Sequence, residues 1–207
     1  MSFGQVNEVN LARIPLVDSF CGTAGENTDL NALVAAGKTR ILCGPGAVLT
    51  ANLTLTGSSG FIVSLFGARA LNLGAYTITV DGATWHLEGL SVMSAAGAGF
   101  VFASNANGCS LVRCAAQSCG SHGIHVNTSF NDHVIQGCYF LSNGGDGIRM
   151  ESGANVCRVI GNFSYGNTGY GINDLSNSAI AVANRIDGNT AGALNGTPAI
   201  DVGNKKT

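Results

Sequence analysis

The sequence predicts an all-β solenoid of the parallel β-helix type. The main observation is a roughly 24-residue repeat between Trp85 and Asn204, and a period of this length indicates a solenoid. In each repeat a glycine precedes an apolar residue, and two further columns, one aliphatic and one of small polar residues, keep the same register. The three columns are Gly99, Gly123, Gly147 and Gly171; Leu87, Leu111, Ile135 and Val159; and Cys119, Asn143, Asn167 and Asn189.

Each repeat contains short alternating runs rather than a helical periodicity. Residues 123–126 (Gly-Ile-His-Val) and 157–160 (Cys-Arg-Val-Ile) are examples, and clusters of Gly, Asn and Ser separate such runs. Alternation is typical of strands, and the clusters are typical of turns. Three short strands and three turns fit within one repeat, and rungs of this kind stack at about 4.8 Å.

The composition fits a single domain of this kind. Charged residues make up 11% of the 207 residues, whereas 45% are hydrophobic and 30 are glycine. Ordinary globular domains contain about 25% charged residues. The net charge is −2 without a run of basic residues, so nucleic acid is not an expected partner. No apolar stretch is long enough to span a membrane, and residues 1–18 lack the apolar segment of a signal peptide.

The chain before the repeats is expected to contain an arm and a capping helix. Residues 1–26 lack periodicity and would form an arm or lead-in, either a disordered terminus or an anchor onto a partner. A short helix is expected over about 29–36, with Asn27 or Thr28 as its N-cap and Gly37 just beyond its end. This helix would cover the N-terminal end of the solenoid, where core and backbone are otherwise open.

The β-helix domain is expected over 27–204, followed by a tail of residues 205–207. Within it, the column of Asn143, Asn167 and Asn189 predicts an asparagine ladder, whose amides bond up and down the stack. No C-terminal cap is visible in the sequence. Either residues 195–207 or another chain would therefore cover that end.

The segment after the expected helix resembles the entry of the pectate-lyase-like superfamily. A helix ending in Ala-Ala-Gly is followed by a strand, the turn Pro45-Gly46-Ala47 and the run Leu53-Thr54-Leu55. The later Gly-Ile and Asn-Gly rungs are similar to the repeats of that family, although Cys43-Gly44 precede Pro45 where the usual motif has a further proline. The resemblance covers residues 27–204 and implies a right-handed β-helix. The family includes phage tailspikes and other phage appendage proteins.

Polar side chains are expected to gather on one side of the β-helix. Alternation along the strands points Ile124, Val126, Ile148, Met150 and Ile172 inward and the residues beside them outward. In proteins of the similar family this long face often binds saccharides. The candidate saccharide-binding residues are His122, His125, Asn127, Asp146, Arg149, Glu151, Tyr170 and Asn173.

Three of these residues, Asp146, Arg149 and Glu151, are also the catalytic candidates. Glycoside hydrolysis needs two carboxyl groups about 5 to 9.5 Å apart. No two acids are separated by exactly one or two repeats, and Glu151 and Asp174, which fall one position short of a full repeat, would point to opposite faces. Asp146 and Glu151 flank Arg149 on one rung, so a pair across the strand is open. The resemblance also implies a lyase template with Arg149 as base, but no acid cluster is present to hold its Ca²⁺.

The seven cysteines do not predict a metal site. Cys114 and Cys138 share a column, which favours small, buried and reduced side chains over a disulfide. Cys109, His133 and Cys157 share another column, but its outer members would lie about 9 to 10 Å apart. One Zn²⁺, which bonds at about 2.0 to 2.3 Å, cannot bridge them. The sequence predicts no metal, no cofactor and no assignable Ser-His-Asp or Cys-His triad.

Three functions remain open at this point. The first is a structural component of a bacteriophage virion, such as a tailspike-like, fibre or capsid-decorating protein, made in the host cytoplasm without a signal peptide. It would form a homotrimer, contact a host surface glycan, and contact other virion proteins through the N-terminal arm or the uncapped C-terminal end. The second is a polysaccharide lyase or glycoside hydrolase that uses the polar face. The third is a non-catalytic carbohydrate-binding module on that same face.

Overall fold

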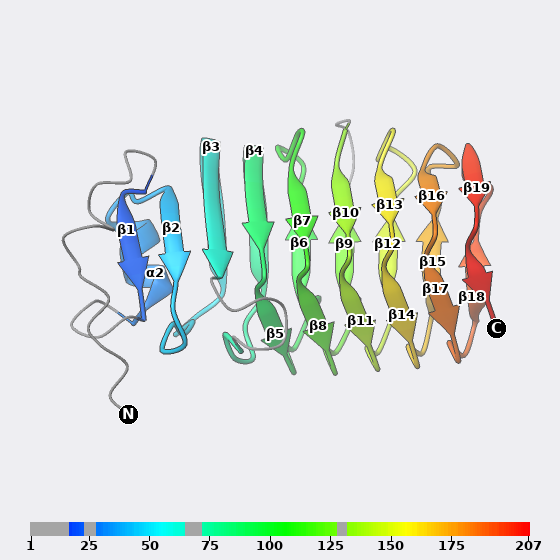
Figure 1. Cartoon of the computed structure of the whole chain (residues 1–207), viewed down its shortest axis with the longest axis horizontal. Helices are drawn as coiled ribbons and strands as arrows, with labels where there is room; N and C mark the ends of the chain where they lie inside the picture. The colour runs from blue at the N-terminus through cyan, green and yellow to red at the C-terminus, as the bar shows by residue number, and fades with distance from the viewer. Residues whose placement is uncertain (1–16, 23–27, 65–71, 128–131) are drawn as a thin grey trace, which may run out of the picture.

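The protein folds as a parallel β-helix whose coils stack along one axis (Figure 1). The computed structural model describes residues 17–22, 28–64, 72–127 and 132–207. Each strand pair in these ranges is parallel. The predicted all-β solenoid is therefore confirmed.

A regular coil contributes one strand to each of three faces. The first face contains β6 (Phe100–Phe102), β9 (Ile124–Val126), β12 (Ile148–Met150), β15 (Tyr170–Asp174) and β18 (Gly192–Asn195). The second face contains β7 (Ser110–Val112), β10 (Val134–Gln136), β13 (Arg158–Ile160), β16 (Ile180–Val182) and β19 (Ile200–Val202). The third face contains β5 (Ser91–Met93), β8 (Ala115–Gln117), β11 (Tyr139–Leu141), β14 (Phe163–Tyr165), β17 (Arg185–Asp187) and β20 (Lys205–Lys206).

The first two faces merge near the N-terminus into long strands. The first half of β4 (Ile78–Glu88) pairs with β6 and its second half pairs with β7. β3 (Leu53–Ser64) runs beside β4, and β2 (Arg40–Cys43) and β1 (Ser19–Cys21) continue the second face. Part of the predicted arm thus forms a strand of the solenoid, whereas the rest of residues 1–26, apart from 17, 18 and 22, lies outside the described ranges.

The strand register confirms the predicted repeat. Arg149 pairs with His125 on one side and with Asn173 on the other, each one full repeat away in the sequence. The repeat shortens toward the C-terminus, because Ile180 pairs with Arg158 and with Ile200, which are both closer to it in the sequence than one full repeat. The side chains predicted to point inward are buried, and they are Ile124, Val126, Ile148, Met150 and Ile172.

The expected capping helix is present as α2 (Leu30–Ala35), beside β1 and β2 at the N-terminal end (Figure 1). Its N-cap is Asp29, whose side chain accepts the N–H of Asn31 at 2.9 Å. The expectation of Asn27 or Thr28 as N-cap was wrong, because Asp29 is still extended and bridges to Val48. Leu30 is fully buried in the core. No helix in the described residues has the length and apolarity that a membrane span requires.

The last coil carries charges at positions that are apolar in the coil before it. Asp201 pairs in register with buried Ala181, and Lys206 pairs with buried Ile186. The Lys206 ammonium forms an ion pair with the Asp201 carboxylate. Residues 195–207 thus continue the stack through β19 and β20, and the ion pair places polar groups against the end of the apolar core. The predicted tail belongs to this last coil.

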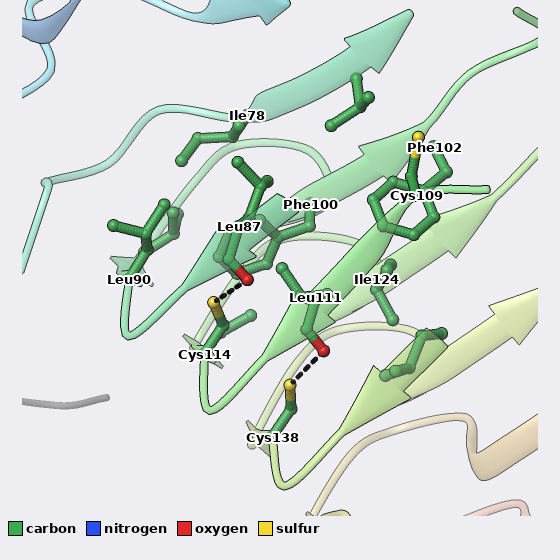
Figure 2. Packing of buried hydrophobic residues seen from close by; sticks show 14 of the residues in the cluster. Ile78, Leu87, Leu90, Phe100, Phe102, Cys109, Leu111, Cys114, Ile124 and Cys138 are labelled. Atoms are coloured by element: carbon green, nitrogen blue, oxygen red, sulfur yellow. Dashed lines mark hydrogen bonds between the residues drawn. The ribbon is translucent and has the colours of Figure 1, made fainter. Parts of the chain in front are cut away.

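All seven cysteines are buried and free. Cys114 and Cys138 stack on successive coils, and their Sγ atoms donate to the carbonyl oxygens of Leu87 and Leu111 at 3.7 and 3.3 Å (Figure 2). Burial raises the pKa of the Cys138 thiol to about 12. The predicted column of small, buried cysteine side chains is thus present, and its members are poor nucleophiles because the raised pKa disfavours the thiolate.

The predicted asparagine ladder is present, and the structure adds a second one. In the first, the amide of Asn143 donates to Asn167 at 2.9 Å and that of Asn167 donates to Asn189 at 2.8 Å. The second continues the column of Cys114 and Cys138, with side-chain amide bonds of 3.0 and 2.8 Å. Its members are Asn162, Asn184 and Asn204.

Candidate functional site

Six of the eight predicted saccharide-binding residues form one hydrogen-bonded group on the first face. β12 buries Ile148 and Met150, so Arg149 between them points outward. Its register partners, His125 on β9 and Asn173 on β15, point outward beside it. The turn before β12 and the residue after it supply the two acids. We call this group the polar cluster: His122, His125, Asp146, Arg149, Glu151 and Asn173.

Asp146 is the buried hub of the polar cluster, with 4% of its surface exposed. Its Oδ1 accepts the backbone N–H of Tyr170 at 2.7 Å. Its Oδ2 accepts the side-chain amide of Asn173 at 2.8 Å and lies 3.4 Å from Arg149 Nη1. Asn173 in turn accepts the amide of Asn195 at 3.0 Å. The Asp146 carboxylate therefore ties its own coil to the next one below the surface, and Asn173 extends these bonds to a third coil.

Glu151 is held by two donors that converge on one oxygen. Arg149 Nε lies 2.7 Å from Glu151 Oε1, and His125 Nε2 lies 2.9 Å from the same atom. The hydrogen bond from Arg149 lowers the pKa of Glu151 below its ordinary value, and His125 acts in the same direction. The hydrogen bond that Arg149 donates to Glu151, together with the charges of Glu151 and Asp146, raises the pKa of Arg149. Both side chains are therefore charged and fixed at neutral pH.

His122 is held in its neutral form. Its Nδ1 accepts the backbone N–H of Asp146 at 2.8 Å, so that nitrogen has no proton of its own. The 3.5 Å approach of Nδ1 to Asp146 Oδ2 is consequently not an ion pair of two charged groups. Burial lowers the pKa of His122, and the charges of His125 and Arg149 lower it further. The negative charges of Asp146 and Glu151 act in the opposite direction.

The lowered pKa of His122 predicts that the unfolding free energy of the protein decreases on mild acidification. The pKa of His122 is lower in the folded chain than the unfolded value of about 6.5. The stabilisation is therefore present above about pH 6.5 and declines as the pH falls below it, since the unfolded chain then binds more protons. His86 and His133, whose pKa values are also lowered by burial, contribute with the same sign. Chemical unfolding measured at pH 7.5 and 5.5 checks this result.

A His122→Gln variant provides the control for the acid effect. Its amide oxygen can accept the Asp146 N–H without titrating. We expect the difference in unfolding free energy between the two pH values to be smaller than in the wild type. An unchanged difference would contradict the assignment of His122 as one of its sources.

The structure places the two remaining predicted residues outside the bonded group. Asn127 is exposed directly after β9, one coil before Glu151. Tyr170 contributes its backbone N–H to Asp146, and its ring lies against Gly192, where an added Cβ would be 3.4 Å from it.

Asp174 is completely buried, as alternation predicted, and its carboxylate accepts the backbone N–H groups of Ser176, Asn177 and Ala179.

The column of Cys109, His133 and Cys157 is an internal packing column. His133 Nδ1 accepts the backbone N–H of Cys109 at 3.3 Å, and its ring lies 4.9 Å from that of Phe102. Among the described residues no group of three or more potential ligands could hold a metal ion. The part of the chain that the structure covers thus offers no set of metal ligands.

Sequence reasoning missed a second polar group on the second face. His86 Nδ1 lies 2.7 Å from Ser110 Oγ, and His86 Nε2 lies 2.9 Å from Glu88 Oε2. The other carboxylate oxygen of Glu88, Oε1, forms an ion pair with Arg113. The spacing of one repeat between His86 and Ser110 was the available signal. Ser110, His86 and Glu88 are thus bonded in the order of a nucleophile, a base and an acid. Acyl transfer also needs hydrogen-bond donors for an oxyanion. The backbone N–H of Val134, which lies beside Ser110, is already used, because it donates to Cys109 O at 3.0 Å.

The polar cluster can bind by fixed hydrogen bonds but is poorly suited to proton transfer. A general acid at neutral pH needs a carboxyl group with a raised pKa, and that of Glu151 is lowered. A base needs an accessible unprotonated group, and the pKa of Arg149 is raised. His125, Arg149 and Glu151 are each about one quarter exposed, at 27%, 29% and 24% of their side-chain surface. These three present hydrogen-bonding atoms to solvent in a geometry that their mutual contacts hold.

Comparison with known proteins identifies the family. A search among curated proteins and one among solved structures returned no match. A family model described as a right-handed β-helix region matches residues 37–197, which is more than half of the chain. The match agrees with the stacked parallel strands and supports the predicted right-handed coil. The chain belongs to the right-handed β-helix family.

Proposed function

We propose that this β-helix is a non-catalytic structural protein of a bacteriophage particle, which contacts a saccharide through the polar cluster. It would be an appendage-type member of the pectate-lyase-like superfamily. The observation that carries the non-catalytic part is the state of the two acids. Asp146 is buried beneath three donors, and Glu151 is kept ionised by Arg149 and His125. Carboxylates used in this way position neighbours rather than exchange protons.

The exposed atoms of the polar cluster suit a hydroxyl-rich ligand. Arg149 and His125 offer donors, and Glu151 offers an acceptor, within one bonded group. A saccharide hydroxyl both donates and accepts, so it can pair with either kind of group. Because their mutual bonds already hold the side chains, binding would cost little additional side-chain entropy.

The second face supports the trimeric part of the proposal. From β7 to β16 the inward residues of this face are buried, and from β7 to β19 most of the outward residues beside them are β-branched and apolar. Ile200 and Val202 are 44% and 57% exposed. Contiguous exposed apolar surface marks interaction sites, and flat sheets of this kind pack face to face at about 10 Å. The outward apolar residues are Val112, Val134, Ile160, Ile180, Val182, Ile200 and Val202.

The saccharide contact is tested by a glycan panel scored for both binding and cleavage. We expect binding without turnover in the wild type, and a loss of affinity of about tenfold or more in Arg149→Ala, since a charged hydrogen-bonding group is removed. Arg40→Ala, at an exposed arginine near the N-terminal end, is the matched control and should bind normally. Turnover that Glu151→Gln abolishes would instead favour a polysaccharide lyase or glycoside hydrolase.

The oligomer is tested by native mass at micromolar concentration. A trimer would have three times the chain mass of 21.0 kDa. Ile180→Asp together with Val182→Asp should yield monomers, because two charges would be buried on the apolar face. Gln117→Asp, on the third face, should leave the mass unchanged. A wild-type monomer would contradict self-association in solution and leave a decoration protein that assembles only on its partner.

A further inference from the structure

The outward surface of the third face carries an aromatic platform. Strands β11 and β14 bury Phe140 and Ser164 between them and point their flanking residues outward. In register, Tyr139 lies beside Phe163 and Leu141 lies beside Tyr165. Two strands thus present a block of two by two large apolar side chains. We call this block the aromatic platform: Tyr139, Leu141, Phe163 and Tyr165.

The rings of the platform are ordered by contacts with one another. Tyr139 and Phe163 meet edge to face with centroids 6.2 Å apart. Phe163 and Tyr165 have centroids 5.9 Å apart and planes inclined by only 20°. Tyr165 is nevertheless 48% exposed. Its ring lies over Gly188, where an added Cβ would come within 3.2 Å of it. A glycine at that turn lets the ring lie close to the coil, so that part of the ring remains accessible to solvent.

Polar groups flank the platform on the next coil. Arg185 Cζ lies 5.0 Å from the centroid of the Phe163 ring, and its guanidinium is 3.6 Å from Asp187 Oδ2. Arg185 is 59% exposed and Asp187 is 31% exposed on their side chains, so both can still reach a ligand. Their charges compensate one another. The edge of the platform therefore offers donors and acceptors with little net charge.

We propose that the aromatic platform is a saccharide-binding site distinct from the polar cluster. One face of a pyranose ring carries mainly C–H groups, and these pack favourably against the electron-rich face of an aromatic ring. Hydroxyls at the rim of the sugar would bond Arg185 and Asp187. Flat rings with a few placed polar groups are typical of small-ligand recognition. The proposal does not depend on the polar cluster, since it uses a different sheet and different residues.

Charge favours a saccharide over a single-stranded nucleic acid, which also stacks on aromatic residues. Nucleic-acid binding relies on several uncompensated cations that neutralise phosphates. Here Arg185 is paired with Asp187, and the whole chain has a net charge of −2. A ligand that is rich in hydroxyls and poor in charge matches this surface better.

The test measures the binding of soluble neutral and acidic oligosaccharides by titration calorimetry or ligand-observed NMR. Tyr165→Ala is expected to weaken binding about tenfold, because it removes the most exposed ring of the platform. Tyr165→Phe keeps the ring and should bind within about twofold of the wild type. Tyr76→Ala removes a comparably exposed tyrosine, 37% exposed, outside the platform and should bind normally. Far-ultraviolet circular dichroism of each variant checks that the β-helix is intact.

The outcomes separate this inference from the proposed function. Binding that falls in Tyr165→Ala and persists in Arg149→Ala supports the platform. The class of oligosaccharide that binds with higher affinity, neutral or acidic, then identifies the ligand. Binding that falls only in Arg149→Ala overturns the platform and leaves the polar cluster. Binding to no saccharide overturns both. Binding to a single-stranded oligonucleotide in place of any saccharide would overturn the platform as a sugar site.

Discussion

Replacing Gly147 with alanine is expected to lower the unfolding free energy by about 3 kcal/mol or more. The added Cβ would lie 2.0 Å from Ser164 Oγ and 2.7 Å from the carbonyl oxygen of Gly171. Neither atom is free to move away, because Ser164 Oγ donates to that same carbonyl at 2.9 Å and accepts from Asn167 at 3.0 Å. For a chain of this size the melting temperature would fall by roughly 6 to 12 °C, as scanning calorimetry can measure.

Gly97→Ala is the matched control for this substitution. A Cβ at Gly97 would meet only Thr77 Oγ1, at an ordinary distance of 3.7 Å, and its backbone does not require glycine. We expect a change within about 0.5 kcal/mol. Equal stability of Gly147→Ala and Gly97→Ala would refute the steric explanation of the glycine column.

Replacing Asn167 with alanine is expected to destabilise the fold by a similar amount, about 3 kcal/mol, because buried hydrogen-bonding groups lose their partner. Asn167 is fully buried. Its Oδ1 accepts both the backbone and the side-chain N–H of Asn143 at 2.9 Å, and its Nδ2 donates to Phe140 O and to Asn189 Oδ1. Each buried group left unsatisfied by the truncation costs about 1 to 3 kcal/mol. Urea unfolding of the variant measures the loss.

Asn155→Ala provides the comparison for the ladder, because Asn155 is an exposed asparagine outside both ladders. Its unfolding free energy should match that of the wild type. Asn189→Ala should fall between the two, since Asn189 is only partly buried and lies toward the end of its ladder. A loss at Asn167 no larger than at Asn155 would show that water satisfies the exposed partners and that the ladder adds little stability.

The glycine column illustrates why the solenoid could be predicted from the sequence. Each coil repeats the contacts of the previous one, so a steric demand recurs at the period of the chain. A Cβ at Gly123 would lie 2.6 Å from Gly147 O, just as one at Gly147 would lie 2.7 Å from Gly171 O. The same translation repeats the leucine column and the asparagine ladder. The same residue types therefore recur in the sequence with the period of the coil.

The candidate site was predictable only as a set of outward positions. Alternation and the spacing of one repeat placed His125, Arg149 and Asn173 on one face, which the register confirms. They could not show that Asp146 folds inward beneath Arg149, or that Glu151 receives two donors on one oxygen. These details depend on side-chain torsions and on the depth of each turn, for which the repeat carries no signal.

Irregular coils hid three further features from sequence reasoning. The second ladder, Asn162, Asn184 and Asn204, has steps shorter than the regular repeat and therefore leaves its register. The N-cap lies at Asp29, because a bridge to Val48, which is distant in sequence, keeps Asp29 extended. The charged pair of Asp201 and Lys206 sits at inward positions only because the final coil keeps the register of the coil before it.

The sequence by itself determined the all-β class, the coil length, the buried columns and the outward face that carries the polar residues. Those features follow from alternation and from a repeated translation, which are local rules applied many times. Only the tertiary structure decided which side chains bond, which acid is buried, and how three faces acquire polar, apolar and aromatic surfaces. These choices arise where neighbouring coils meet, because contacts between residues a whole coil apart in the sequence depend on the actual packing distance.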